Sequence, residues 1–163
     1  MKYRWNLAPA QPLLTEKLAT QFGVSRLLAQ CLVNRGHSEP HAIETFLHPK
    51  LKNLADPFLL PNMEAAVGRL HQARERDELV VVFGDYDVDG VTSTTLMLEI
   101  LGRLGWRVNS YLPHRFEEGY GLSREAVENC VAKHSPRLLL AVDCGSTAVE
   151  SIQLLKEQGI DTI

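Results

Sequence analysis

The sequence has no long apolar run and few cysteines, and these absences exclude several classes of protein. No stretch of about 18 consecutive apolar residues occurs, so no membrane-spanning helix is predicted. The segment MKYRWNLAPAQ at the start lacks the apolar core of a secretory signal, which predicts a cytoplasmic protein. The three cysteines have no metal-type spacing, and their odd number suits a reducing compartment.

A basic excess is also absent. Residues 1–80 carry 10 Lys and Arg against 8 Asp and Glu, whereas residues 81–163 carry 7 against 12. The net charge of −3 therefore has its source in the second half of the sequence. A broad basic surface for nucleic acid is not predicted. If the protein binds a polyanion, metal ions and a few local arginines must provide the attraction.

The remaining sequence is that of a globular protein, since 45% of its 163 residues are apolar and 23% are charged. Residues 1–60 are predicted to form a small helical N-terminal segment with a connector at its end. Apolar residues at helical spacing predict three helices, over 13–23, 25–36 and 39–49. Pro57 and Pro61 exclude regular structure from the connector.

Residues 61–163 alternate between apolar strands and amphipathic helices. Strands are predicted over 79–83, 107–112, 137–142 and 160–163. Helices are predicted over 63–77, 92–105, 124–134 and 147–159, the first and third with Asn62 and Ser123 as N-caps. This order predicts an α/β fold, an open parallel sheet with helices on both faces. Because the fourth strand begins where the sequence ends, 61–163 is expected to be the first part of a longer domain.

Acidic residues follow two of the predicted strands. In VVVFGDYDVDGVTSTT, Asp85, Asp87 and Asp89 come directly after a buried strand, and in LLLAVD another strand leads to Asp143. The carboxyl ends of parallel strands border the ligand crevice of an open sheet, so these four carboxylates are expected to converge. Their mutual repulsion would be relieved by a hard divalent cation such as Mn²⁺ or Mg²⁺, which prefers oxygen ligands.

Simpler interpretations of these aspartates remain possible. Taken alone, Asp85 or Asp143 is as readily explained as a helix N-cap or a turn former. The segment DYDVDG also fits the first six positions of an EF-hand loop. Against the EF-hand, the twelfth position is Leu96 rather than Glu, and a strand precedes the motif. Four aspartates at two strand ends favour a metal site.

Small polar residues at two predicted helix starts indicate phosphate binding. Free N–H groups and the helix dipole favour an anion there, and the candidate residues are Thr92, Ser93, Gly145 and Ser146. N-capping alone is the alternative explanation for the hydroxyl groups. Metal-binding carboxylates beside phosphate sites indicate hydrolysis of a phosphoester or phosphoanhydride.

The segment PHRFEEGYGL offers further contacts to a substrate. Arg115 could hold a phosphate with two hydrogen bonds, and Tyr120 offers a ring on which a base could stack. The alternative is an ordinary surface loop with a solvated arginine. His114, beside a proline, is interpreted as structural rather than as a metal ligand. Cys144 is expected to be an unreactive packed thiol.

These motifs together resemble the DHH phosphoesterase superfamily. VVVFGDYDVDGVTSTT and LLLAVDCGS are similar to its first two motifs. Trp5 and the segments LLAQCLVNRG, FLHPKLKNLADPFLLPNMEAAVGRL and YLPHRFEEGYGLS resemble more specifically its branch of bacterial single-strand DNA exonucleases. The resemblance implies a two-metal site of Mn²⁺ or Mg²⁺ held by Asp87, Asp89 and Asp143, with Asp85 as a ligand or an indirect partner.

The resemblance also implies a function and a set of partners. Members of this branch degrade single-stranded DNA from the 5′ end in DNA repair and recombination. The implied partners are single-stranded DNA, with a single-strand-binding protein and a helicase as further candidates. The sequence departs from the family in one respect, because the Asp-His-His motif should follow the fourth strand and the sequence ends at Ile163. A site without the ligands of this motif binds metal weakly, so little or no nuclease activity is expected of these residues alone.

Two other functions are considered. The first, within the superfamily, is a phosphodiesterase or phosphatase acting on oligonucleotides, cyclic dinucleotides or pyrophosphate. The second is a non-catalytic relative that binds partners in a replication complex. The four aspartates argue against the second function, because a scaffold gains nothing from keeping repelling carboxylates together.

Overall fold

The computed structural model describes residue 4 and residues 6–163, so Trp5 lies outside the described residues. The chain divides into two compact units, Met1–Asp56 and Pro57–Ile163, and each has its own core. No helix in the described part of the chain is long and apolar enough to cross a bilayer.

The first unit is a group of short helices. Its elements are α1 (Pro12–Phe22), α2 (Arg26–Asn34), α3 (Pro40–Leu47) and the 3₁₀ turn η1 (Leu51–Asn53). Local sequence sets the boundaries: proline opens α1 and α3, and α1 ends at Gly23, which has a left-handed backbone (φ 63°). The Ser25 hydroxyl accepts the Leu28 N–H at the start of α2 (3.1 Å). Leu18, Leu32 and Ile43 are buried where the three helices meet.

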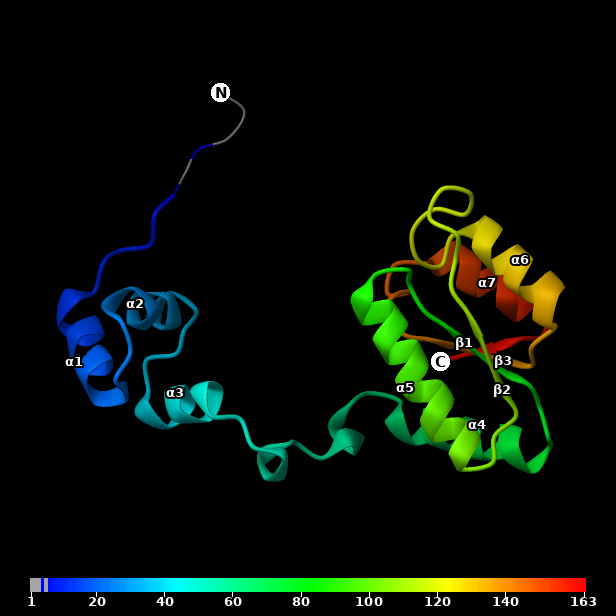
Figure 1. Cartoon of the computed structure of the whole chain (residues 1–163), viewed down its shortest axis with the longest axis horizontal. Coiled ribbons are helices and arrows are strands. Elements are labelled where there is room, and N and C mark those ends of the chain that lie inside the picture. Colours follow the sequence, from blue (N-terminus) through cyan, green and yellow to red (C-terminus); the bar gives the residue numbers. More distant parts are fainter. Residues whose placement is uncertain (1–3, 5) are drawn as a thin grey trace. The chain divides into compact units, whose positions relative to one another are not determined.

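The second unit is an α/β sheet (Figure 1). Its elements are η2 (Pro57–Leu59), α4 (Met63–Glu75), β1 (Val80–Phe83), α5 (Val88–Arg103), β2 (Val108–Tyr111), α6 (Arg124–His134), β3 (Leu138–Ala141), α7 (Val149–Glu157) and β4 (Asp161–Thr162). The four strands are parallel, in the order β2-β1-β3-β4. Helices α4 and α5 cover one face and α6 and α7 the other, which confirms the predicted fold class.

Both faces of the central strands are apolar, because both are covered by helices. Val81 and Phe83 of β1 point into the core under α6 and α7. Val80 and Val82 point into the core formed with α4 and α5. All four side chains are fully buried. The uninterrupted apolar run therefore reflects burial on both sides, as expected for a parallel sheet.

The strand order places the ends of β1 and β3 side by side. Phe83 pairs with Ala141 at the last position of both strands. From β1 the chain crosses to β2 at one side, and β3 then returns to the other side of β1. Loops that leave in opposite directions open a crevice between the two strands, where ligands of open α/β sheets bind. The segments after Phe83 and Ala141 are the two acidic ones.

Some predicted boundaries are wrong. Helix α5 begins at Val88, four residues before the predicted Thr92, because Asp87 caps it: its Oδ1 accepts the Gly90 N–H at 3.0 Å. Helix α7 begins at Val149 rather than Thr147. Asn62 precedes α4 as predicted, but it has a left-handed backbone (φ 62°) and its side chain makes no capping hydrogen bond. Ser123 does cap α6, by accepting the Ala126 N–H at 3.1 Å.

The first turn of α5 lies against the end of β1 with no room for a side chain at Gly90. A Cβ atom added there would overlap the backbone nitrogen and oxygen of Asp85. Backbone cannot move aside as a flexible side chain can, so only glycine permits this approach. The contact brings the start of α5, with Asp87 and Asp89, close to Asp85.

We expect Gly90→Ala to lower the free energy of unfolding by about 3 kcal/mol, because the new methyl group overpacks against backbone. Gly102→Ala is the matched control in the same helix. A Cβ atom at Gly102 would meet only Val108 Cγ1, at 3.8 Å, so this variant should be as stable as the parent or about 0.5 kcal/mol more stable. Urea unfolding of the two variants measures the difference. Equal stabilities would contradict the close approach.

Candidate functional site

Asp85 is a fully buried carboxylate at the end of β1. Its Oδ1 accepts the Tyr86 N–H at 2.8 Å, whereas Oδ2 is buried and has no hydrogen-bond partner among the described residues. A buried carboxylate oxygen without a partner is costly, and a cation would remove that cost. The orphaned oxygen, in a set of hard oxygen donors, therefore fits a divalent metal ion.

Three more carboxylates lie around this position. Asp87 and Asp89 are exposed at the start of α5, where Asp87 uses one oxygen to cap the helix. Asp143 follows β3 and has a left-handed backbone (φ 59°), an uncommon conformation for a residue other than glycine. Aspartate adopts this conformation more readily than most residues, and Asn62, Asp77 and Ser135 have it elsewhere in the chain.

The pKa of Asp143 is affected by the other aspartates. Desolvation, the negative charges of Asp87 and Asp89, hydrogen bonding to Asp87 and the charge of Asp85 together raise the pKa of Asp143. Carboxyl groups from two separate strand ends therefore interact, as the strand order requires.

The four carboxylates follow neighbouring strand ends, but they do not form a metal site in the described part of the chain. Within residue 4 and residues 6–163, no group of three or more Asp, Glu, His or Cys side chains is arranged to hold a metal ion. Like charges repel, so these side chains are expected to keep apart until a cation lies among them. The capping bond of Asp87 also holds one of its oxygens toward the helix rather than toward Asp143.

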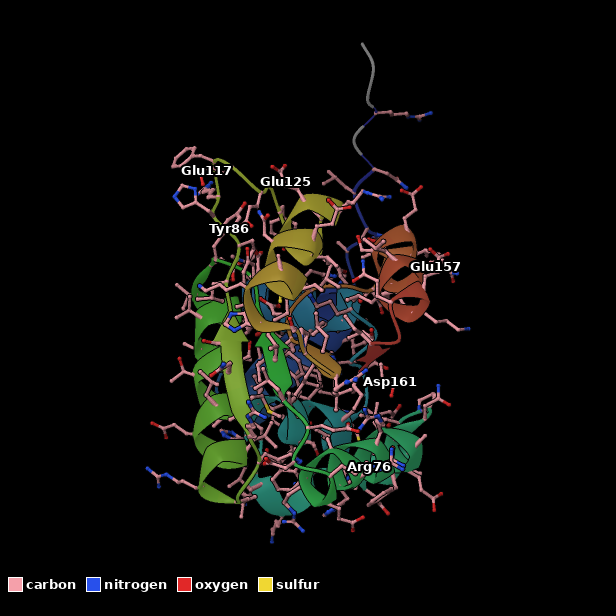
Figure 2. The ribbon with its side chains drawn as sticks, turned by 90° about the vertical axis from the view of Figure 1, so that its right-hand side faces the viewer. Arg76, Tyr86, Glu117, Glu125, Glu157 and Asp161 are labelled. Carbon is pink, nitrogen blue, oxygen red and sulfur yellow. The ribbon has the colours of Figure 1, made fainter. Side chains whose placement is uncertain are left out.

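The loop between β2 and α6 (112–123) reaches the same end of the sheet. Hydrogen bonding to Asp85, followed by the charges of Asp85, Asp87 and Asp143, raises the pKa of the exposed Tyr120 hydroxyl. Among the described residues, Asp85 Oδ2 still has no partner that meets hydrogen-bond geometry, so Tyr120 interacts with Asp85 without satisfying this oxygen. Figure 2 shows Tyr86 at the end of the sheet where the loop carries Glu117, and Arg76 toward the other end.

Aromatic and cationic groups of this loop contact Tyr86. The ring of Tyr120 meets the ring of Tyr86 edge to face, with a centroid distance of 5.9 Å. The guanidinium carbon of Arg115 lies 5.2 Å from the centroid of the Tyr86 ring. Because Tyr86 stands between Asp85 and Asp87 in the sequence, the structure brings both predicted loop residues, Arg115 and Tyr120, to the acidic cluster.

The hydroxyl groups of Thr92 and Ser93 point toward the N-terminal end of α5. Thr92 Oγ1 donates to the Val88 carbonyl at 2.7 Å, and Ser93 Oγ donates to the Asp89 carbonyl at 2.5 Å. Both residues lie one turn inside the helix rather than at its start. The structural basis for their predicted role, free N–H groups at a helix start, is therefore wrong, and a phosphate contact through them stays a prediction.

Gly145 and Ser146 lie in a turn between β3 and α7. Gly145 has a positive φ of 99°, and a Cβ atom there would meet Ala141 Cβ at 3.5 Å. The Ala148 N–H donates to the Gly145 carbonyl at 3.0 Å, which closes the turn before α7 begins. These residues follow Asp143 directly but stand outside the helix, and their phosphate-binding role also stays a prediction.

Two residues set aside in the sequence behave as ordinary structural groups. The Nδ1 atom of the exposed His114 ring lies 3.6 Å from the carboxylate of Glu117. Burial, with the charges of Asp85 and Asp143, raises the pKa of the Cys144 thiol to about 11. A thiol in this environment stays protonated at neutral pH and is a poor nucleophile.

Sequence reasoning missed Tyr86 and Glu118. Tyr86 stands in the acidic motif itself, and its spacing between two aspartates was the available signal. Glu118 is buried whereas its neighbour Glu117 is exposed, and no local pattern in EEG distinguishes them. Only contacts with residues from β2 and α6 do so.

A hollow of about 700 Å³ lies away from the acidic cluster. It is formed by the start of α4 and by β4, and its lining is mostly apolar, with Leu60, Met63 and Ile163 among the residues. Its charged members, Arg69 and Asp161, pair with each other at 2.6 Å. This hollow therefore does not coincide with the acidic cluster.

Comparisons with known proteins agree with this geometry. The sequence profile of the DHH family, N-terminal domain, matches residues 79–163. The chain belongs to the DHH family. The match begins at the first buried strand and contains all four aspartates, so the DHH region coincides with the sheet, its crevice and the acidic cluster.

Relatives within the DHH family are similar over much of the chain. The single-stranded-DNA-specific exonuclease RecJ of Bacillus subtilis is 36% identical over 162 residues, which are 99% of this chain and 20% of that protein. The chain thus spans about a fifth of the length of this relative. A crystal structure of exonuclease RecJ bound to manganese has 37% identity and a TM-score of 0.58, and covers 67% of this chain and 28% of its own. The crystal structure of RecJ in complex with Mn²⁺ from Thermus thermophilus has 25% identity and a TM-score of 0.61. The match covers 96% of this chain and 21% of that chain.

We expect Asp143→Asn to raise the melting temperature by a few degrees at neutral pH in the absence of divalent ions. The raised pKa means that ionisation of Asp143 destabilises the folded state, so the advantage of the variant is present above the folded pKa. The stability advantage of the variant should disappear as the pH falls below the pKa that the Asp143 carboxyl has in the unfolded chain. Asparagine tolerates the left-handed backbone, so the fold is kept.

The same variant should lose much of the stabilisation that Mn²⁺ gives to the parent. Glu75→Gln, on the exposed end of α4, removes the same charge away from the cluster and is the matched control. Thermal unfolding with and without Mn²⁺, at neutral and at acid pH, makes both measurements. A melting temperature that falls at neutral pH would contradict the repulsion.

Proposed function

We propose that the acidic cluster is the protein's part of a two-metal centre that hydrolyses phosphodiester bonds of single-stranded DNA from the 5′ end. The observation that supports this proposal most directly is the interaction of Asp143 with the carboxylates that follow β1. Family membership supports the reaction class, and the names and bound ions of the RecJ relatives support the substrate and the metal.

Each carboxylate has a distinct place in this centre. Asp85 would hold a cation through its orphaned Oδ2 while the Tyr86 N–H fixes its other oxygen. Asp87 would bind through the oxygen not used for capping, and Asp89 and Asp143 would complete the set. Bound Mn²⁺ or Mg²⁺ supplies an activated water and neutralises charge on the leaving oxygen.

The loop residues would bind and orient the strand. Arg115 can form two hydrogen bonds to one phosphate, and its contact with the Tyr86 ring keeps it beside the cluster. The rings of Tyr86 and Tyr120 offer faces on which a base can stack. A base is free to stack in this way only when it is unpaired, which favours a single strand over a duplex.

Two parts of this proposal depend on more than the described geometry. Roles in DNA repair and recombination, a cytoplasmic location, and a single-strand-binding protein and a helicase as partners are proposed from the resemblance to this branch of the DHH family. That the 163 residues alone have little or no activity also stays a prediction. The alternative function is a phosphodiesterase or phosphatase that acts on dinucleotides or pyrophosphate. The following experiment distinguishes it from a single-strand exonuclease.

We expect Asp87→Asn to lower the release of nucleotides from 5′-labelled single strands by about 100-fold or more, because the centre loses a carboxylate ligand to a metal ion that would stabilise developing charge. Asparagine is as good an N-cap as aspartate, so α5 should keep its start and the melting temperature should change little. The assay uses the full-length native protein with Mn²⁺, beside the 163-residue chain. Asp161→Asn, distant on β4, removes the same charge and is the control.

The choice of substrates distinguishes the candidate functions. The proposal requires that long single strands be degraded in preference to duplexes, dinucleotides and pyrophosphate. Faster cleavage of dinucleotides or pyrophosphate would instead support the alternative. Full activity of Asp87→Asn would exclude Asp87 from the metal centre and limit it to helix capping.

A further inference from the structure

Glu118 is a second buried carboxylate, and in contrast to Asp85 its oxygens are satisfied by the protein itself. It is only 8% exposed. The hydroxyl of Tyr111 and the amide of Asn129 donate to its Oε1, the latter at 2.7 Å, and the His114 N–H donates to its Oε2 at 2.6 Å. Tyr111 ends β2, His114 begins the turn, and Asn129 lies on α6, so one side chain joins three segments.

These donors keep Glu118 charged. Burial alone would raise its pKa, but hydrogen bonds from Tyr111, His114 and Asn129 outweigh burial, and the pKa of Glu118 is lowered. Burial and the bond to Glu118 raise the pKa of Tyr111, which therefore stays a neutral donor. A charged acceptor with three donors makes stronger bonds than a neutral group would.

The backbone around Glu118 closes the loop on itself. The Glu117 and Glu118 N–H groups donate to the His114 carbonyl, at 3.1 and 2.9 Å, and this turn contains Arg115. The Ser123 hydroxyl donates to the Glu118 carbonyl at 2.5 Å while it caps α6. The turn is therefore fixed to the helix by both the side chain and the backbone of Glu118.

Apart from their contacts with Tyr86 and Asp85, the functional groups of the loop are exposed. Arg115 is exposed, and Phe116 beside it is 90% exposed. Tyr120 stands between Gly119 (φ 78°) and Gly121 (φ 63°), two residues with wide backbone freedom. Glu118 is the buried carboxylate that joins this loop to β2 and α6.

We propose that Glu118 is a positioning residue, which holds the Arg115 turn and Tyr120 against the acidic cluster so that the incoming strand is bound in register with the metal centre. This role rests on the proposed function. Within the described part of the chain, the hydrogen bonds of the Glu118 carboxylate go to Tyr111, His114 and Asn129 and not to the aspartates of the cluster. It acts through Arg115 and Tyr120, and its loss should be seen as weaker substrate binding rather than as loss of the metal.

The test compares Glu118→Gln with Glu117→Gln in the full-length native protein, on 5′-labelled single strands with Mn²⁺. The two variants remove the same charge from adjacent positions of one loop, so long-range attraction to DNA changes equally. Glutamine at 118 brings an N–H₂ group where a second acceptor oxygen is needed. We expect KM to rise about 10- to 100-fold for Glu118→Gln, with a much smaller change in kcat, as for misplaced binding groups. Glu117→Gln should leave both constants near the parent values.

Two further measurements separate positioning from mere stability. Tyr111→Phe removes one donor without changing the core, and it should raise KM in the same direction by a smaller factor. The Mn²⁺ concentration that gives half-maximal activity should be the same in all variants. A general structural defect would instead lower the amount of active enzyme, so that kcat falls and KM stays.

The outcomes are distinct. A folded Glu118→Gln protein with the KM of Glu117→Gln would overturn the positioning role and leave the proposed function intact. A fall in kcat at constant KM, or a parallel loss of Mn²⁺ dependence, would also overturn it. If the parent protein degrades no single strand, the proposed function fails, and the role of Glu118 fails with it.

Discussion

Repulsion between carboxylates at the ends of two neighbouring strands is the constraint on which the rest of the site depends. Strand order places the segment after β1 beside the segment after β3, and the close approach at Gly90 adds the start of α5. The fold therefore concentrates negative charge: among the described residues Asp85 keeps a buried oxygen without a hydrogen-bond partner, and the pKa of Asp143 is raised. Such an arrangement costs stability unless a cation is bound.

Glu118 shows the opposite solution to the same physical problem. Glu118 is a buried carboxylate in the loop that carries Arg115 and Tyr120. Three donors satisfy it, and its pKa is lowered. The contrast between Glu118 and Asp85 separates a carboxylate that holds structure from one that is prepared to bind a ligand. Burial is common to both, and the supply of hydrogen-bond donors is the difference.

Local sequence was sufficient for most of the fold. The apolar run of β1 predicted a strand buried on both faces, and the alternation of strands and helices predicted the parallel sheet. Ser123 was a correct N-cap because its hydroxyl needs only the next three residues. The start of α5 was predicted too late, because the acidic motif was interpreted as a loop, whereas Asp87 caps the helix and Asp89 already lies within it.

The sequence by itself determined that four aspartates stand at two strand ends, since their positions relative to the apolar runs follow from residue order alone. The tertiary structure decided how each carboxylate is satisfied. Whether Asp85 is left with an unpaired oxygen among the described residues, or Glu118 rather than Glu117 is buried, depends on the donors that the fold places around each carboxylate, such as Tyr111 and Asn129. Hydrogen bonding and desolvation act through space, and no short pattern in the sequence encodes them.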